Sequence, residues 1–200
     1  QGEFVMLGAL SMITLWSGFE LSLPLAFLLT IAGVSVVGII LERLAIRSVR
    51  KPHPIVLIII TIGASILLRG VAMLGWGKDA HSSPAFSRNE PFEVAGATLL
   101  PQSLWILGIV LVIVTALHFF TRGTLTGKAM QACAINKRAA WLLGIPSETM
   151  VLLAFAMSAG MGAVGGILIA PISMSSYDMG MMLGLKGFCA RVVASSAWAS

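Results

Sequence analysis

The 200-residue chain is 58% hydrophobic and only 10% charged, with a formal net charge of +5 at pH 7. Soluble domains carry roughly 25% charged residues, so a soluble globular fold of this size is excluded and an integral membrane protein is indicated. The basic residues stand at the ends of apolar runs, where they predict membrane topology, and no nucleic-acid partner is expected.

The first apolar run, residues 4–16, is short for a membrane span, because a helix of this length measures roughly 20 Å. It is either the second half of a span or a broken, re-entrant helix. We favour the first, since the chain starts abruptly, without an initiator methionine or a signal peptide pattern. The next run, residues 21–41, is long enough to cross, and Pro24 lies in its first turn, where a missing N–H costs little.

Two further spans are predicted at residues 54–75 and 103–120, separated by the polar loop 76–102. Arg69 lies toward the far end of the first of these spans. We interpret it as an arginine whose side chain reaches the outer interface, with a role in a substrate path as the alternative. His118 ends the second span and is interpreted as interfacial, rather than as a proton relay.

The fourth complete run, residues 149–170, is rich in small residues. Ser158, Gly162 and Gly166 recur four apart on one face, which predicts a helix inside a bundle. Two roles stay open for this face: it permits close packing, or it lines and gates a transport path. A last, incomplete apolar run begins near Leu183.

We therefore predict an all-α integral membrane protein, a polytopic helical bundle of about five to six spans or part-spans that is truncated at both ends. No apolar run holds an acidic residue, which argues against an ion-coupled transporter. No buried nucleophile and base are paired, so no enzymatic activity and no catalytic residues are expected. No metal or cofactor site is predicted, and Cys133 and Cys189 are isolated, without ligand spacing.

Lysine and arginine counts orient the predicted spans. Segments 42–51 and 122–148 carry four such residues each, and loop 76–102 carries two. The first two segments are therefore predicted to face the cytoplasm, and the loop to face outward. The residues counted are Arg43, Arg47, Arg50 and Lys51, then Arg122, Lys128, Lys137 and Arg138, and in the loop Lys78 and Arg88.

Segment 122–148 contains a predicted short amphipathic helix. Asn136 is expected to cap its start, Gly144 to end it in a left-handed conformation, and Pro146 to prevent its continuation. Such a helix lies either on the lipid surface or in a groove of a soluble partner. Its exposed apolar residues are predicted to be Trp141, Leu142 and Ile145.

The pair Ala139-Ala140, followed by Gly144, resembles the Glu-Ala-Ala-x-x-x-Gly loop of bacterial ABC-importer permeases. Further segments resemble the permeases of branched-chain amino acid importers in particular; these are residues 1–3, 40–50, 127–145 and 184–188. Arg138 stands where that family has Glu, and residues 189–200 depart from the glycine-rich apolar helix expected there.

The resemblance implies a multi-pass subunit of the bacterial inner membrane. It would receive a branched-chain amino acid, or a related small amide such as urea, from a periplasmic binding protein and release it to the cytoplasm by alternating access. The implied partners are ABC ATPase subunits, which bind the ATP, a second permease subunit and the lipid bilayer. An ion-coupled secondary carrier and a scaffold protein are the alternatives.

The resemblance implies one permease domain over residues 1–200, with segment 122–148 as its cytoplasmic coupling loop. The charge counts then place loop 76–102 in the periplasm. The small-residue spacing assigns Ser158, Gly162 and Gly166 to the packing or transport face. The implied ATPase-coupling residues are Asn136, Arg138, Ala139, Ala140, Leu143, Gly144, Ile145 and Pro146.

Overall fold

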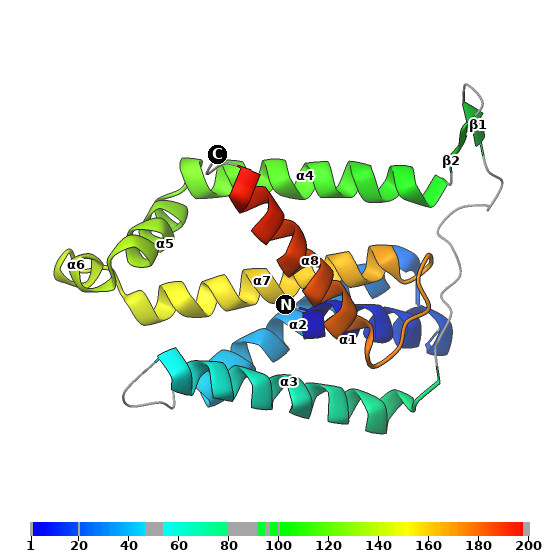
Figure 1. Ribbon diagram of the computed structural model, residues 1–200, viewed down its shortest axis with the longest axis horizontal. Helices are drawn as coiled ribbons and strands as arrows, with labels where there is room; N and C mark the ends of the chain where they lie inside the picture. The colour runs from blue at the N-terminus through cyan, green and yellow to red at the C-terminus, as the bar shows by residue number, and fades with distance from the viewer. Residues whose placement is uncertain are drawn as a thin grey trace. The chain divides into compact units, whose positions relative to one another are not determined.

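A computed structural model of the chain describes residues 2–19, 21–46, 54–79, 92–94, 97–99 and 101–197. The described part is helical apart from one two-stranded hairpin (Figure 1). The elements are α1 (Gly2–Ile13), α2 (Leu23–Leu41), α3 (Pro54–Trp76), β1 (Phe92–Val94), β2 (Ala97–Leu99), α4 (Pro101–Gly123), α5 (Leu125–Ile135), α6 (Lys137–Leu142), α7 (Ser147–Ile169) and α8 (Met179–Ala197). Two π-helical turns, Thr14–Gly18 and Glu42–Ile46, extend α1 and α2.

Four helices are long and apolar enough to cross a membrane, which confirms the four complete spans predicted from the sequence. They are Leu23–Leu44, Ile55–Trp76, Gln102–Gly123 and Ser147–Ile169. The first apolar helix, Gly2–Gly18, is shorter. The last helix, α8, begins at Met179, a turn before the predicted start near Leu183.

The loop predicted to face outward contains the hairpin, in which β1 and β2 pair antiparallel, with Phe92 opposite Leu99. Several basic residues that contribute to the predicted orientation lie outside the described residues, namely Arg47, Arg50, Lys51 and Arg88.

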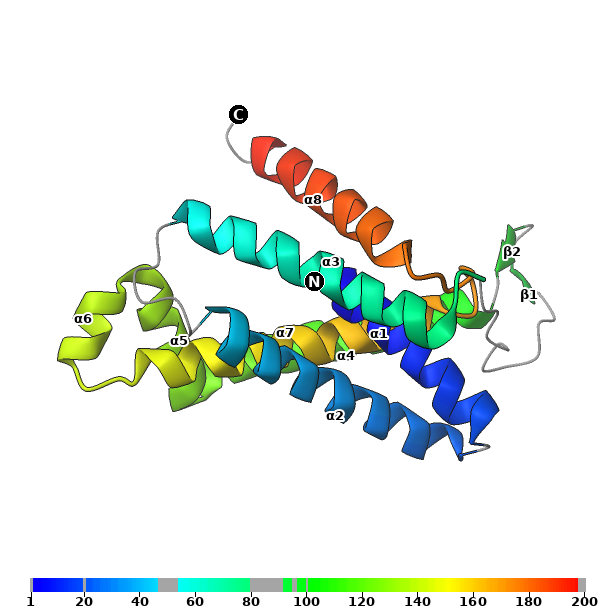
Figure 2. The ribbon, with the colours of Figure 1, turned by 90° about the horizontal axis from the view of Figure 1, so that it is seen from below.

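The chain divides into two compact units. The first holds residues 1–83 and 158–200, with α1, α2, α3, the later part of α7 and α8; the second holds residues 84–157. Within the first unit α1 contacts α2, α3 and α8 (Figure 2). Its side chains are buried around its circumference, as expected of a helix that is apolar on all sides.

Small residues let α1 and α7 approach closely within the first unit. An added Cβ at Gly8 would lie 2.5 Å from the Cα of Ala163, and one at Gly166 would overlap the backbone of Val5. Lipid provides no hydrophobic drive for helix association, so close backbone packing of this kind stabilises the contact. The prediction that this helix lies inside a bundle is confirmed for its later half, where Ala159 and Ala163 are fully buried.

Large apolar side chains cover the outer faces of α3 and α4, each within its own unit. They include Ile59, Ile62 and Ile66 on α3, and Leu107, Leu111 and Val112 on α4. Such extended apolar faces are rare on soluble proteins and suit contact with lipid tails or with other membrane helices.

Candidate functional site

The short helix α6 begins at a side-chain cap. The Asn136 side-chain oxygen accepts hydrogen bonds from the backbone N–H groups of Arg138 and Ala139, both at 3.1 Å. These N–H groups have no partner within the helix, so the cap satisfies two of the donors that a helix start leaves open. The predicted cap is confirmed.

The end of α6 is closed by two backbone hydrogen bonds. Gly144 N–H donates to the Trp141 carbonyl, and Ile145 N–H donates to the Ala140 carbonyl, both at 3.0 Å. Gly144 has φ of 79°, so this is a Schellman motif with glycine in the left-handed position, followed by Pro146. The predicted terminator is confirmed, and α6 is a rigid turn fixed at both ends.

The apolar residues of α6 point outward from the second unit. Trp141, Leu142 and Leu143 are 70%, 78% and 78% exposed, while Ala140 is buried and Ile145 is half-buried. The prediction that Ile145 is exposed is therefore only partly right, because the Schellman turn brings Ile145 back toward the helix. Beside α6 lies a hollow of about 630 Å³, and its lining residues are Lys137, Arg138, Trp141, Pro146, Ser147, Glu148 and Thr149.

The preceding helix, α5, fixes α6 to its neighbours in the second unit. Thr124 caps α5 by accepting from Gly127 N–H at 3.0 Å, and Gly127 packs directly on the backbone of Phe120. At the other end the Cys133 thiol lies 3.7 Å from the Ser147 hydroxyl, which ties α5 to the start of α7. These contacts fix the position of the loop that carries α6 and its exposed apolar side chains.

The three small residues singled out on α7 have different surroundings. Gly166 is buried against Val5 and Ala9 of α1, whereas Ser158 and Gly162 are half-buried. Gly160 is two positions from both Ser158 and Gly162, which puts it on the far side of α7. It packs on α2, where an added Cβ would lie 3.0 Å from the Ser35 hydroxyl. The contact faces of α7 are thus set by Ala163 and Gly166 toward α1 and by Gly160 toward α2.

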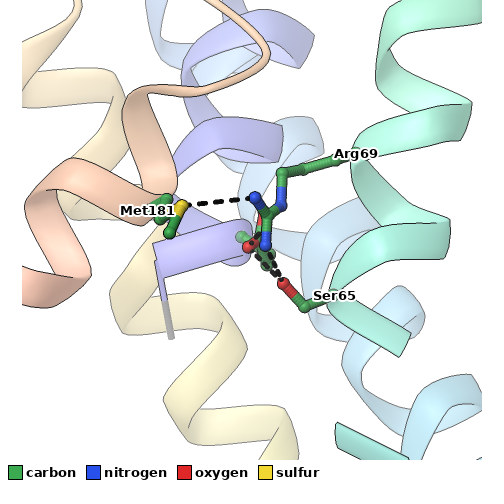
Figure 3. Close-up of polar contacts among 4 residues, drawn as sticks. Ser65, Arg69 and Met181 are labelled. Carbon is green, nitrogen blue, oxygen red and sulfur yellow. Dashed lines mark hydrogen bonds and ion pairs between the residues drawn. The ribbon is translucent and has the colours of Figure 1, made fainter. Parts of the chain in front are cut away.

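A polar cluster in the first unit joins α1, α3 and α8, and we call it the Glu3–Arg69 cluster (Figure 3). Glu3 Oε1 accepts from the Ser65 hydroxyl at 2.6 Å and lies 3.2 Å from Arg69 Nε. Arg69 also donates from Nη2 to Ser65 at 2.8 Å and from Nη1 to the Met181 sulfur at 3.4 Å. The cluster consists of these four residues.

This cluster gives Arg69 a partner that the interpretations made from the sequence did not include, because its guanidinium pairs with the Glu3 carboxylate inside the unit. Glu3 lies in the first turn of α1, where it also accepts a hydrogen bond from Ser65 on α3. Opposite charges at or within apolar runs were the signal that could have found the pair, since intramembrane charges usually pair with one another.

Three further residues were considered from the sequence, namely His118, Cys133 and Cys189. His118 is exposed on α4, its ring edge against Phe119. Across the part of the chain that the structure describes, no group of three His, Cys, Asp or Glu side chains is arranged to hold a metal ion. Cys133 and Cys189 are free thiols.

Comparison with known proteins gives a consistent family. Residues 1–197 match the model for the branched-chain amino acid transport system / permease component. The chain is 30% identical over 199 residues to the high-affinity branched-chain amino acid transport system permease protein LivH of Escherichia coli (strain K12), a match covering 96% of this chain and 63% of LivH. It is 29% identical over 206 residues to the corresponding protein BraD of Pseudomonas aeruginosa, covering 96% of this chain and 67% of BraD.

The matches also show how much of a relative's length the chain covers. The chain spans 63% of the length of LivH, so it corresponds to a part of that relative. No solved structure matches the chain. Together with the four apolar helices, the matches make this a multi-pass membrane protein.

Proposed function

Because the chain belongs to the family of branched-chain amino acid transport system permease components, we propose that it acts in an ATP-driven importer of the bacterial inner membrane. In this proposal it passes a branched-chain amino acid from a periplasmic binding protein to the cytoplasm by alternating access. Its other partners are a second permease subunit and ABC ATPase subunits. The family is one of transport permeases rather than enzymes, and the ATPase subunits bind and hydrolyse the ATP.

The observation that carries the mechanism is the braced helix α6 with its outward apolar residues. Trp141, Leu142 and Leu143 form an apolar knob on a turn whose two ends are capped. An exposed apolar helix face of this kind suits a groove on a soluble partner. We assign the knob to a cleft on an ATPase subunit, in agreement with the cytoplasmic orientation predicted for segment 122–148.

Energy reaches the membrane helices only if α6 binds differently to the two states of the ATPase. Because α6 is closed by hydrogen bonds at both ends, it moves as a rigid piece and carries the start of α7 with it. The face of α7 with Ser158, Gly162 and Gly166 then shifts against its neighbours. Small side chains on that face let the helix move without large steric barriers.

Two substitutions in α6 test this coupling in the full-length chain assembled with its partners. Gly144→Pro forces φ to about −65° where the structure has 79°, and it removes the N–H that donates to Trp141. Ala140→Glu places a carboxylate at a buried position. Uptake and ATP hydrolysis are measured together, and loss of their coupling is expected. Unchanged coupled transport in both variants would contradict the proposal.

Two exposed tryptophans allow the effect of losing the docking residue to be distinguished from the effect of losing any exposed tryptophan. Trp141 on α6 and Trp105 on α4 are 70% and 55% exposed. Trp141→Ala is expected to reduce binding of the ATPase subunits and substrate-stimulated hydrolysis by about tenfold or more, the size of effect seen for a buried aromatic anchor. Trp105→Ala serves as the control, with the same chemical change outside the coupling loop. Equal effects of the two variants would argue against a docking role for α6.

A further inference from the structure

In the Glu3–Arg69 cluster, Arg69 lies inside the long apolar helix α3, and Glu3 lies in the first turn of α1. At 1.5 Å per residue, Arg69 is roughly 22 Å along α3 from Pro54 and roughly 10 Å from Trp76. Its side chain is 27% exposed and that of Glu3 is 14% exposed. Charges placed at this depth in a membrane are costly, and they commonly mark functional positions.

The hydrogen-bonding capacity of the cluster is only partly used. Glu3 Oε1 has two polar neighbours, Ser65 and Arg69, but Glu3 Oε2 is buried with no hydrogen-bond partner among the described residues. On the other side, Arg69 Nη1 donates to the sulfur of Met181, which is a weak acceptor. The buried Glu3 Oε2 and the Nη1 edge of Arg69 are therefore two groups of the cluster without a strong hydrogen-bond partner within the described ranges.

The backbone contact between α1 and α8 determines this arrangement. Gly2 and Gly180 meet so closely that an added Cβ on either would overlap the other's backbone. The residues next in sequence both contact the Arg69 guanidinium: Glu3 lies near its Nε, and the Met181 sulfur accepts from its Nη1, as Figure 3 shows for Met181. Met181 is 48% exposed and has a flexible side chain, so it can leave Arg69 at little cost.

We propose that Glu3, Ser65 and Arg69 form a transient binding site for the zwitterionic head group of an amino acid crossing the membrane. The Arg69 guanidinium takes the carboxylate in place of Met181, and Glu3 Oε2 takes the ammonium group. The inference rests on the proposed function, since it places that substrate in this chain.

Charge balance favours a zwitterion over an ion. The site has one positive and one negative side chain, so a neutral zwitterion adds one charge opposite to each and leaves no net charge in the membrane. When the amino acid leaves, Glu3 and Arg69 pair with each other again, and neither charge is left alone. A free anion or cation would satisfy one side chain and expose the other.

The experiment uses the full-length chain assembled with its partner subunits, and it compares Glu3→Gln/Arg69→Met with the wild type. The double variant removes both charges, so no buried charge is left unpaired and a purely structural pair is replaced at little cost. Uptake of L-leucine is divided by the amount of assembled transporter. We expect the double variant to assemble and melt like the wild type. We expect its uptake to be at least about tenfold lower, because a tenfold change corresponds to the loss of roughly one charge-assisted hydrogen bond to the substrate.

Binding measured without the binding protein gives a second readout. Saturation-transfer NMR on the purified transporter compares L-leucine with its amide, which lacks the carboxylate, and with 4-methylpentanoate, which lacks the ammonium group. We expect a signal from leucine alone, lost in the double variant and weakened in Ser65→Ala, which keeps both charges. Equal signals from all three compounds, or uptake by the double variant within twofold of wild type, would overturn the site.

The wild type distinguishes this failure from failure of the proposed function. If the wild-type transporter imports leucine and the double variant imports it equally well, only the binding site is wrong. If the wild-type transporter imports no branched-chain amino acid, the proposed function fails first.

Discussion

Gly8 of α1 lies against the backbone of Ala163 on α7, so that an added Cβ at position 8 would be 2.5 Å from the Ala163 Cα. Both positions are on helices at the centre of the first unit, and Ala163 is fully buried. The contact explains why α1, a short helix, is packed so tightly: its neighbour presents no side chain larger than a methyl group there.

Gly8→Ala is therefore expected to destabilise the first unit. The new methyl group meets backbone atoms that cannot turn away, and overpacking of this kind costs about 1–3 kcal/mol. The measurement is the melting temperature of the full-length protein in detergent. Gly33→Ala on α2 is the matched control, because nothing lies within 4 Å of an added Cβ there. A Gly8→Ala protein as stable as the Gly33→Ala control would show that Gly8 does not pack against the Ala163 backbone in the folded protein.

Asn136→Ala is expected to loosen α6, whereas Asn136→Asp retains the cap. The alanine variant leaves the N–H groups of Arg138 and Ala139 without their acceptor, at a cost of about 1 kcal/mol. Hydrogen exchange at these two amides, in the assembled transporter and in the free chain, checks the change. Faster exchange in both variants alike would contradict a side-chain cap.

Trp76 donates from Nε1 to the Thr14 hydroxyl at 2.5 Å, which ties the end of α3 to the π-helical turn after α1. Trp76→Phe and Thr14→Val each remove one partner. A double-mutant cycle on thermal stability is expected to give a coupling of about 1 kcal/mol, the net contribution of one such hydrogen bond. Strict additivity of the two substitutions would indicate that the bond contributes nothing.

The orientation of the chain is testable by cysteine labelling. In a background with Cys133→Ser and Cys189→Ser, single cysteines are introduced at Lys137 and at Lys78, both exposed positions. A membrane-impermeant maleimide added outside intact cells is expected to label position 78 and not position 137. After the membrane is permeabilised, position 137 is expected to be labelled as well. Labelling of position 137 from outside would contradict the proposed role of α6, because the proposal places the ATPase subunits in the cytoplasm.

Much of the fold follows from local sequence, for a simple reason. A membrane span requires about 20 apolar residues in a row, and this property is visible without knowledge of any neighbour. The caps of α6 are local in the same sense, since Asn136 and Gly144 bond to groups within five residues. The sequence therefore predicted the spans, the short helix and its two ends.

Contacts between helices followed from the sequence only in part. The small residues of α7 predicted a buried helix, but not that α1 would be its neighbour through Gly8 and Gly166. Any of several helices satisfies a small-residue face, because such a face specifies close approach and not the identity of the partner.

The Glu3–Arg69 cluster was decided by the tertiary structure alone. Ser65 and Glu3 are 62 positions apart, and the sequence by itself offered Arg69 two settings, the membrane interface or a substrate path, without Glu3 as a partner. Hydropathy by itself determined a membrane chain with four complete spans, and the cap residues Asn136 and Gly144 determined the short helix between two of them. Where a buried charge finds its counter-charge depends on how helices pack, and a pattern read along one dimension does not contain that packing.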